Sequence, residues 1–191
     1  NDTNFIPGLN NESFFNKILS NLNSATCWDK IEIQNTKELI NQQGKIIKQI
    51  DNTGKEIEGE IKFLKKNLKK KKDLIYENSP YDLRISVSEE SFKNFTGKTF
   101  NTELIREKYR TKFYYKNEFV IDITKVVEII NTVSKEKYEV EVELLNLESN
   151  MSSKYKAHSA LLLIRDIINF CEQLDDSAEL LELEISEMSI N

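Results

Sequence analysis

Alternation of apolar and polar residues dominates the chain between residues 29 and 146. Segments such as YDLRISVSEE and YEVEVEL carry aliphatic or aromatic residues at every second position, and short polar turns separate them. A further segment, GKIIKQIDNTGKEIEGEIKFL, predicts two strands joined by a turn at DNTG. Many short strands in succession are typical of an antiparallel sandwich or barrel. Residues 29–146 are therefore expected to form the strands of such a sandwich or barrel.

A different pattern marks the two ends of the chain. Apolar residues recur every three or four positions within residues 11–23 and 152–174, and this spacing predicts a helix in each segment. In residues 179–187, Glu182 and Glu184 again alternate with leucine and isoleucine, which predicts one more strand. The expected fold class is α+β: an antiparallel sandwich or barrel with a few flanking helices.

Length and composition limit what the chain can be. With 191 residues, 39% apolar and 31% charged, residues 1–191 are expected to form a single domain with its own core. No apolar run approaches the roughly 20 residues that a bilayer requires, and no signal-peptide pattern opens the chain, so we expect a soluble, intracellular protein without a membrane partner. Two distant cysteines and one histidine argue against a disulfide framework, a zinc site and histidine base chemistry. Catalysis would have to use carboxylates and cationic groups.

Two strand segments line up charges of one sign on one face. Side chains two apart in a strand lie roughly 6.5 to 7 Å from one another. The glutamate row is Glu139, Glu141 and Glu143, and the basic row is Arg106, Lys108 and Arg110. Each row taken alone is compatible with a solvent-exposed strand face. A barrel lined with both rows would instead hold phosphate oxygens and a hard divalent cation, which is the chemistry of triphosphates.

Two more charged segments have alternative interpretations. The lysines of KKNLKKKK are typical of a solvated or RNA-attracting surface, with Lys65 or Lys66 as the candidate to point inward. In YDLRISVSEE, alternation puts Arg84 and Glu90 on one polar face, which could equally be exposed to solvent. The net charge of −5 counts against a nucleic-acid partner only as an average, because the charges are strongly segregated along the chain.

Six motifs follow one another in a recognisable order: FIPGL, TGKE before the lysine cluster, YDLRIS, RxKxR, IDITKV and YEVEVEL. In this order the chain resembles the RNA 5′-triphosphatases of mRNA capping of the fungal, protozoan and DNA-virus type, within the triphosphate tunnel metalloenzyme superfamily. The resemblance implies a closed antiparallel β-barrel, the tunnel, which the strand of residues 179–187 would complete. It implies an enzyme that removes the γ-phosphate of triphosphate-ended RNA with Mg²⁺ or Mn²⁺, the first step of cap formation. It also implies an mRNA guanylyltransferase as partner and the nucleus as location, or the cytoplasm for a viral protein, and it is compatible with a homo-oligomer.

The resemblance further implies roles for individual residues. Six basic residues would bind the phosphates: Arg106, Lys108, Arg110, Arg84, Lys66 and Lys48. The first three of these would also stabilise the transition state. Glu141 or Glu90 would orient the attacking water, and Asp122 of IDIT would support the basic wall. The family usually has arginine two places before that aspartate, whereas this chain has Val120.

The same resemblance implies a metal site with a missing part. Its expected ligands are Glu143, Glu182 and Glu184, together with Glu139, which would also pair with the basic wall. The family places an ExE strand just before the FxPGL segment, whereas this chain opens at NDTNFIPGL. If the C-terminal segment that contains LELE, residues 181–184, is placed before residue 1, the motifs follow the family order. The hypothesis is therefore a circular permutation.

Two other functions fit the same residues. One is a tunnel-fold hydrolase acting on tripolyphosphate or another small triphosphate. The other is a non-catalytic barrel that binds RNA or a protein partner, in which the charge rows are only structural. The lysine cluster and the capping-type motifs favour RNA as the substrate.

Overall fold

The computed structural model describes residues 5, 8, 9, 11–75, 82–97, 99–145, 155–167 and 169. Seven long strands follow one helix along the chain, and all seven belong to one sheet in the order β4-β3-β2-β1-β5-β6-β7. Strands β1 to β4 pair antiparallel with their neighbours in this order. The elements are α1 (Glu12–Ser24), β1 (Lys30–Asn41), β2 (Gly44–Gln49), β3 (Lys62–Leu74), β4 (Leu83–Asn94), β5 (Leu104–Tyr115), β6 (Phe119–Ile130) and β7 (Val133–Leu144).

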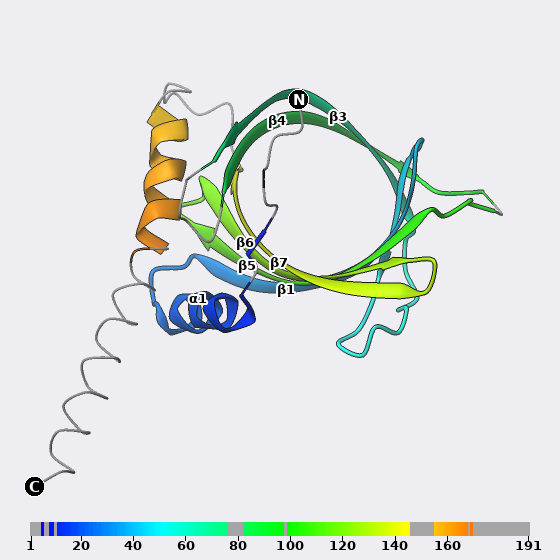
Figure 1. Ribbon diagram of the computed structural model, residues 1–191, viewed down its shortest axis with the longest axis horizontal. Coiled ribbons are helices and arrows are strands. Elements are labelled where there is room, and N and C mark those ends of the chain that lie inside the picture. Colours follow the sequence, from blue (N-terminus) through cyan, green and yellow to red (C-terminus); the bar gives the residue numbers. More distant parts are fainter. Residues whose placement is uncertain are drawn as a thin grey trace, which may run out of the picture. The chain divides into compact units, whose positions relative to one another are not determined.

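By its internal contacts the chain divides into two compact units. The first contains Asn1–Asn11, Ile31–Lys112 and Asp122–Glu141, and the second contains Glu12–Lys30, Phe113–Ile121 and Val142–Asn191. In the first unit, the strands form one curled sheet (Figure 1). The alternation of polar and apolar residues in the sequence favours strands, because successive side chains of a strand point to opposite faces of the sheet.

The second unit has a compact apolar core. Helix α1 buries Phe15, Ile18 and Leu22, which are three or four residues apart and so lie on one side of the helix. The indole N–H of Trp28 donates a hydrogen bond to the carbonyl of Leu22 at 2.6 Å, and its ring lies 5.3 Å from that of Phe113, which is fully buried. An aromatic contact of this kind fixes the segment that follows the helix.

Strand register decides which side chains of the first unit share a face. Glu38 lies opposite Ile47, two residues from Lys45, and Lys45 lies opposite Leu64. Directly opposed residues in antiparallel strands point to the same side of the sheet, as do residues two apart. The face that carries Glu38 and Lys45 is here called the site face. It continues through Leu64 and Lys66 of β3 to Glu90 of β4, which lies opposite Lys66.

Gly8 and Leu9 lie against β7, an edge of the sheet as far as the structure describes it. The amide of Leu9 donates a hydrogen bond to the carbonyl of Tyr138 at 2.6 Å, forming an isolated antiparallel bridge. Gly8 has a φ of +80°, and a Cβ at this position would meet the Tyr138 oxygen at 2.6 Å. Glycine is required here both for its backbone conformation and for the close approach.

Most of the elements predicted from the sequence are confirmed. The first helix spans Glu12–Ser24, residues 155–167 are helical, and the strands of the α+β antiparallel sheet run from residue 30 to residue 144. The expected strand at 179–187 lies outside the described residues, and among the strands that the structure describes β4 and β7 are the two edges of the sheet. Closure of the barrel therefore stays a prediction.

The predicted turn at DNTG is confirmed. The carboxylate of Asp51 accepts hydrogen bonds from the amides of Thr53 and Lys55, and the strands on either side of the turn, β2 and β3, pair antiparallel, although β3 begins only at Lys62. A second hairpin, in which Asn41 pairs with Gly44, joins β1 to β2, so β1 is much longer than its KIEIQ core. None of the described helices has the length and apolar character needed to cross a membrane.

Candidate phosphate and metal site

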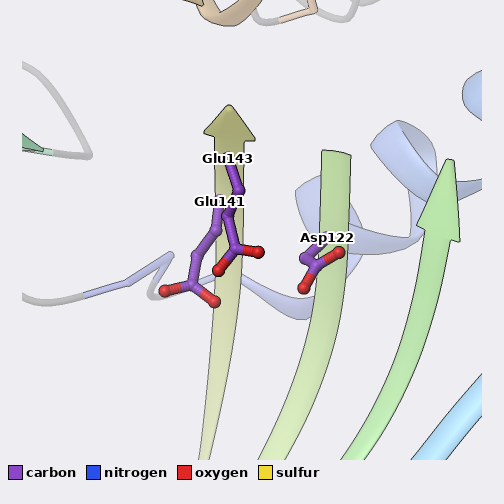
Figure 2. Close-up of side chains that lie close together, drawn as sticks. All are labelled: Asp122, Glu141 and Glu143. Carbon is purple, nitrogen blue, oxygen red and sulfur yellow. The ribbon is translucent and has the colours of Figure 1, made fainter. Parts of the chain in front are cut away.

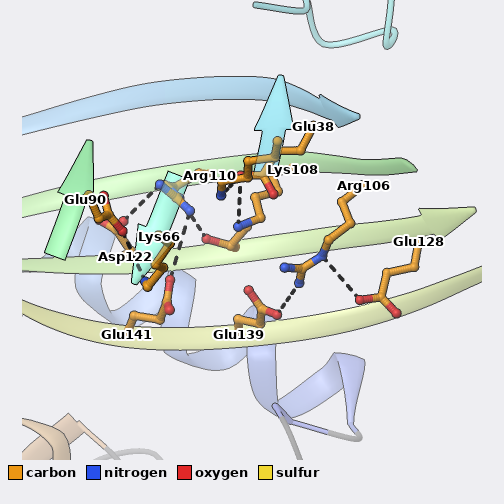
Figure 3. Close-up of polar contacts among 12 residues, drawn as sticks. Glu38, Lys66, Glu90, Arg106, Lys108, Arg110, Asp122, Glu128, Glu139 and Glu141 are labelled. Carbon is orange, nitrogen blue, oxygen red and sulfur yellow. Dashed lines mark hydrogen bonds and ion pairs between the residues drawn. The ribbon is translucent and has the colours of Figure 1, made fainter. Parts of the chain in front are cut away.

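Strand β5 supplies a row of basic side chains to the site face. Arg106, Lys108 and Arg110 alternate along it, as the sequence predicts, and Lys112 extends the row. Each of these side chains is mostly enclosed and makes ion pairs with carboxylates of neighbouring strands (Figure 3). The row is therefore held in place by acids on both sides.

Arg106 is bound by two glutamates. Its guanidinium contacts Glu128 of β6 at 3.2 Å and Glu139 of β7 at 2.6 Å. Guanidinium presents its donors in a rigid fork, so two acceptors fix its orientation. Glu139 thus pairs with the basic wall, one of the two roles implied for it, and Glu128 is a partner that the sequence did not indicate.

Arg110 lies over a buried aspartate. Its guanidinium is 3.3 Å from Asp122 and 4.0 Å from Glu141, and its Nε donates a hydrogen bond to the hydroxyl of Thr124 at 3.2 Å. Lys112 also contacts Asp122, at 3.2 Å. Burial raises the pKa of Asp122 above its ordinary value, although Arg110 and Lys112 act in the opposite direction. Asp122 thus contacts two side chains of the basic row, although Val120 stands where the family usually has arginine.

A second buried carboxylate, Glu38 of β1, was not among the predicted site residues. It contacts Lys45 at 2.6 Å and Lys108 at 3.4 Å, and its Oε2 atom is buried without a hydrogen-bond partner. Burial alone would raise the pKa of Glu38, but the two ammonium groups lower it below its ordinary value. Burial lowers the pKa of Lys108, and Glu38 opposes that shift. Glu38 is thus the counterion that keeps Lys108 charged inside the protein.

The lysines of β2 and β3 divide between the two faces of the sheet. Lys66 lies opposite Glu90 on the site face and contacts it at 3.1 Å, whereas Lys65 points to the other side. Lys48 lies opposite Lys37, away from the site face, and pairs with Glu56 at 2.7 Å. The structure therefore does not bring Lys48 to the other predicted phosphate ligands. Lys45 is the lysine of this hairpin that lies on the site face.

Arg84 of β4 shares the site face with Glu90. It is held by Asp73 at 2.6 Å, and its guanidinium carbon lies 4.0 Å from the ring centroid of Phe5. The FIPGL segment therefore contacts strands near both edges of the sheet, through Phe5 at β4 and through Leu9 at β7. A cation over an aromatic face is attracted to it, which orients the guanidinium.

Three carboxylates on β6 and β7 form an acidic group (Figure 2). Asp122, Glu141 and Glu143 each offer one oxygen, and these oxygens lie within 4.8 Å of one another. The donor set consists of hard oxygens, and Asp122 has a buried oxygen, Oδ1, without a hydrogen-bond partner. The group therefore fits a divalent cation. Glu139 is not a member of the group, and Glu182 and Glu184 lie outside the described residues.

Together, the fold and the site define a class of protein: a curled antiparallel β-sheet with a row of basic side chains beside carboxylates suited to a metal ion. The chain belongs to the family of the mRNA capping enzyme beta chain, whose model matches residues 51–177. No curated protein matches the sequence significantly.

Solved structures of capping triphosphatases share the fold. The S. pombe Pct1 RNA triphosphatase is 18% identical over 91% of this chain and 69% of its own, with a TM-score of 0.57. A second Pct1 structure, in complex with the Spt5 CTD, is 17% identical over 91% and 68%, with a TM-score of 0.58. The Mimivirus capping enzyme triphosphatase is 20% identical over 84% and 86%, with a TM-score of 0.60.

Proposed function

We propose that this protein is an RNA 5′-triphosphatase that hydrolyses the bond between the β- and γ-phosphates of triphosphate-ended RNA and leaves a 5′-diphosphate end for capping. The observation that carries the proposal is the basic row of β5, held by carboxylates on the same face as the acidic group. Membership of the capping-enzyme family supports this choice.

The basic residues would act by binding and orienting the triphosphate. Arg106, Lys108 and Arg110 donate to phosphate oxygens, with Lys66 and Arg84 approaching from β3 and β4. Because their carboxylate partners fix them before substrate arrives, little reorganisation is needed when charge builds up in the transition state. Phosphoryl transfer depends largely on such positioning and charge stabilisation. Lys45 is placed to help through the same carboxylate as Lys108.

The acidic group would hold Mg²⁺ or Mn²⁺. Asp122, Glu141 and Glu143 are the described candidates, and we propose that Glu182 and Glu184 complete the site from the C-terminal segment. When bound, the metal would supply charge neutralisation at the γ-phosphate. A water could be oriented by Glu141 or by Glu90, whose carboxylate is tied to Lys66 on the site face.

The decisive experiment measures γ-phosphate release from triphosphate-ended RNA and from tripolyphosphate. We expect release from RNA with the higher kcat/KM, and loss of release in Glu143→Gln but not in Glu58→Gln, an exposed glutamate outside the site. A much higher kcat/KM for tripolyphosphate would favour the small-triphosphate hydrolase. No release from either substrate would favour the non-catalytic barrel.

The contribution of the C-terminal segment has its own test. Alternation along a strand puts Glu182 and Glu184 on one face and Glu187 on the other. We therefore expect Glu182→Gln and Glu184→Gln to weaken Mn²⁺ binding, measured by calorimetry, while Glu187→Gln leaves it unchanged. Equal affinity in all three variants would remove this segment from the site and with it the argument for a circular permutation.

The cellular setting follows from capping. We propose an mRNA guanylyltransferase as the partner that consumes the diphosphate product, and the nucleus as the location, or the cytoplasm if the protein is viral. Co-purification with the guanylyltransferase of the same organism would test the first point, and imaging of the tagged protein the second.

A further inference from the structure

Strands β3 and β4 carry a positive charge that the rest of the chain does not share. Within Lys62–Leu74 and Leu83–Asn94 there are nine lysine or arginine residues and three acidic ones, a net charge of +6, whereas the whole chain has a net charge of −5. Most residues of both strands are exposed. The charge of this two-stranded ribbon is therefore concentrated on an accessible surface.

Register separates two groups of lysines on the ribbon. Lysines with an acidic partner include Lys66 with Glu90, Lys69 with Glu89 and Lys71 with Asp73. On the face away from the site, Glu89 takes part in the pair with Lys69, but several other lysines of that face have no acidic partner among the described residues. They include Lys65, Lys70 and Lys72, which lie opposite Ser91, Val87 and Ile85.

These three lysines form an extended row along β3. At roughly 3.3 Å per residue, Lys65 and Lys72 lie about 23 Å apart along β3. The exposed side chains of Val87 and Ile85, on the neighbouring strand β4, lie beside this row. We call this surface the outer lysine face. An extended row of unpaired ammonium groups complements an extended polyanion better than a compact anion.

We infer that the outer lysine face binds the RNA chain downstream of its 5′ end. This inference rests on the proposed function, because the RNA chain bound here belongs to the same molecule whose triphosphate end is the substrate. The two faces belong to the same ribbon, and Arg84 and Lys72 lie on opposite faces near the end where Leu74 pairs with Leu83. An RNA whose 5′ end lies beside Lys66 and Arg84 can pass around that end and place its phosphates along Lys65, Lys70 and Lys72.

The test measures RNA binding without hydrolysis. A fluorescent 20-nucleotide RNA with a 5′-hydroxyl end is titrated in EDTA at several salt concentrations, and the slope of log Kd against log salt is compared between variants. Single-stranded nucleic acid gives a slope of about 0.7 for each phosphate contacted. We expect the triple change Lys65→Gln, Lys70→Gln and Lys72→Gln to reduce the slope by about 2, while tripolyphosphate hydrolysis is unchanged.

A matched control removes three lysines elsewhere. Lys17, Lys55 and Lys135 lie outside the ribbon, and changing all three to glutamine alters the net charge equally. Equal losses of slope in both triple variants, or no loss in either, would overturn the inference. So would an acidic peptide that binds the face while RNA does not. The binding assay contains no triphosphate, so its outcome does not depend on triphosphatase activity. If the triple variant shows the expected smaller slope but the unmodified protein releases no γ-phosphate, the proposed function is refuted while the inference of an RNA-binding face is supported.

Discussion

Replacing Glu38 by glutamine should expose how the basic row is kept charged. The side chain is buried, and it contacts Lys45 at 2.6 Å and Lys108 at 3.4 Å. Glutamine preserves the shape and one acceptor oxygen but removes the charge. Loss of one partner from a buried ion pair typically costs 3–5 kcal/mol. We expect a loss of about 3 kcal/mol, because Lys45 is partly exposed and can be hydrated while Lys108 cannot.

The pH dependence of this loss gives it a distinctive signature. The folded-state pKa of Glu38 is lowered, so its stabilisation is present above the unfolded pKa of about 4.5 and is lost as the pH falls through the folded value. Below that value the carboxyl is neutral, as glutamine is. The difference in unfolding free energy between the two proteins should therefore shrink in acid.

Urea unfolding at pH 7 and at progressively lower pH measures this difference, with Glu58→Gln as the exposed control. A double-mutant cycle with Lys108→Met isolates the coupling, since removing both charges should cost less than the sum of the single changes. A loss that stays constant down to acid pH, or a cycle without coupling, would refute the counterion role of Glu38.

Three further changes test other parts of the structure. Arg106→Lys keeps the charge but loses the fork that engages two glutamates, and it should lower kcat/KM for triphosphate RNA about tenfold, or ~1.4 kcal/mol. Gly8→Ala should lower the free energy of unfolding by roughly 1–2 kcal/mol, whereas Gly59→Ala, whose Cβ would meet nothing within 4 Å, should not. Mn²⁺ at 100 times its Kd should stabilise the protein against thermal unfolding by about 2.7 kcal/mol, and Glu143→Gln should reduce that gain. Equal gains in both proteins would contradict the metal assignment.

The charge rows could be predicted from the sequence because the strand period fixes them locally. Arg106 and Arg110 stay on one face wherever the strand pairs, and so do Glu139 and Glu141. Their mutual contacts need only that β5, β6 and β7 be neighbours, which follows from two short hairpin connections. Alternation within one strand is therefore reliable information about a site.

The basic residue of the first hairpin could not be predicted in the same way. Which lysine of GKIIK faces the site depends on register, and register depends on the turn. With the turn at Asn41 and Gly44, Lys45 lies opposite Ile40 and on the face of Glu38, while Lys48 lies on the other face. Glu38 was missed for a related reason: TKELI has no strict alternation, and its burial depends on strands distant in the sequence.

The charge balance of the site face explains why a metal is expected there. Every basic side chain placed at the site already has a carboxylate partner, in the pairs Lys45–Glu38, Lys66–Glu90, Arg84–Asp73, Arg106–Glu139, Lys108–Glu38, Arg110–Asp122 and Lys112–Asp122. These pairs join seven basic side chains to five carboxylates, because Glu38 and Asp122 each have two partners; Glu128, Glu141 and Glu143 bring the acids to eight. A triphosphate end therefore brings several negative charges to a surface without surplus positive charge. Glu141 and Glu143 add further negative charge beside Asp122. Positively charged ions must therefore enter with the substrate, and the acidic group is where the described residues can hold them.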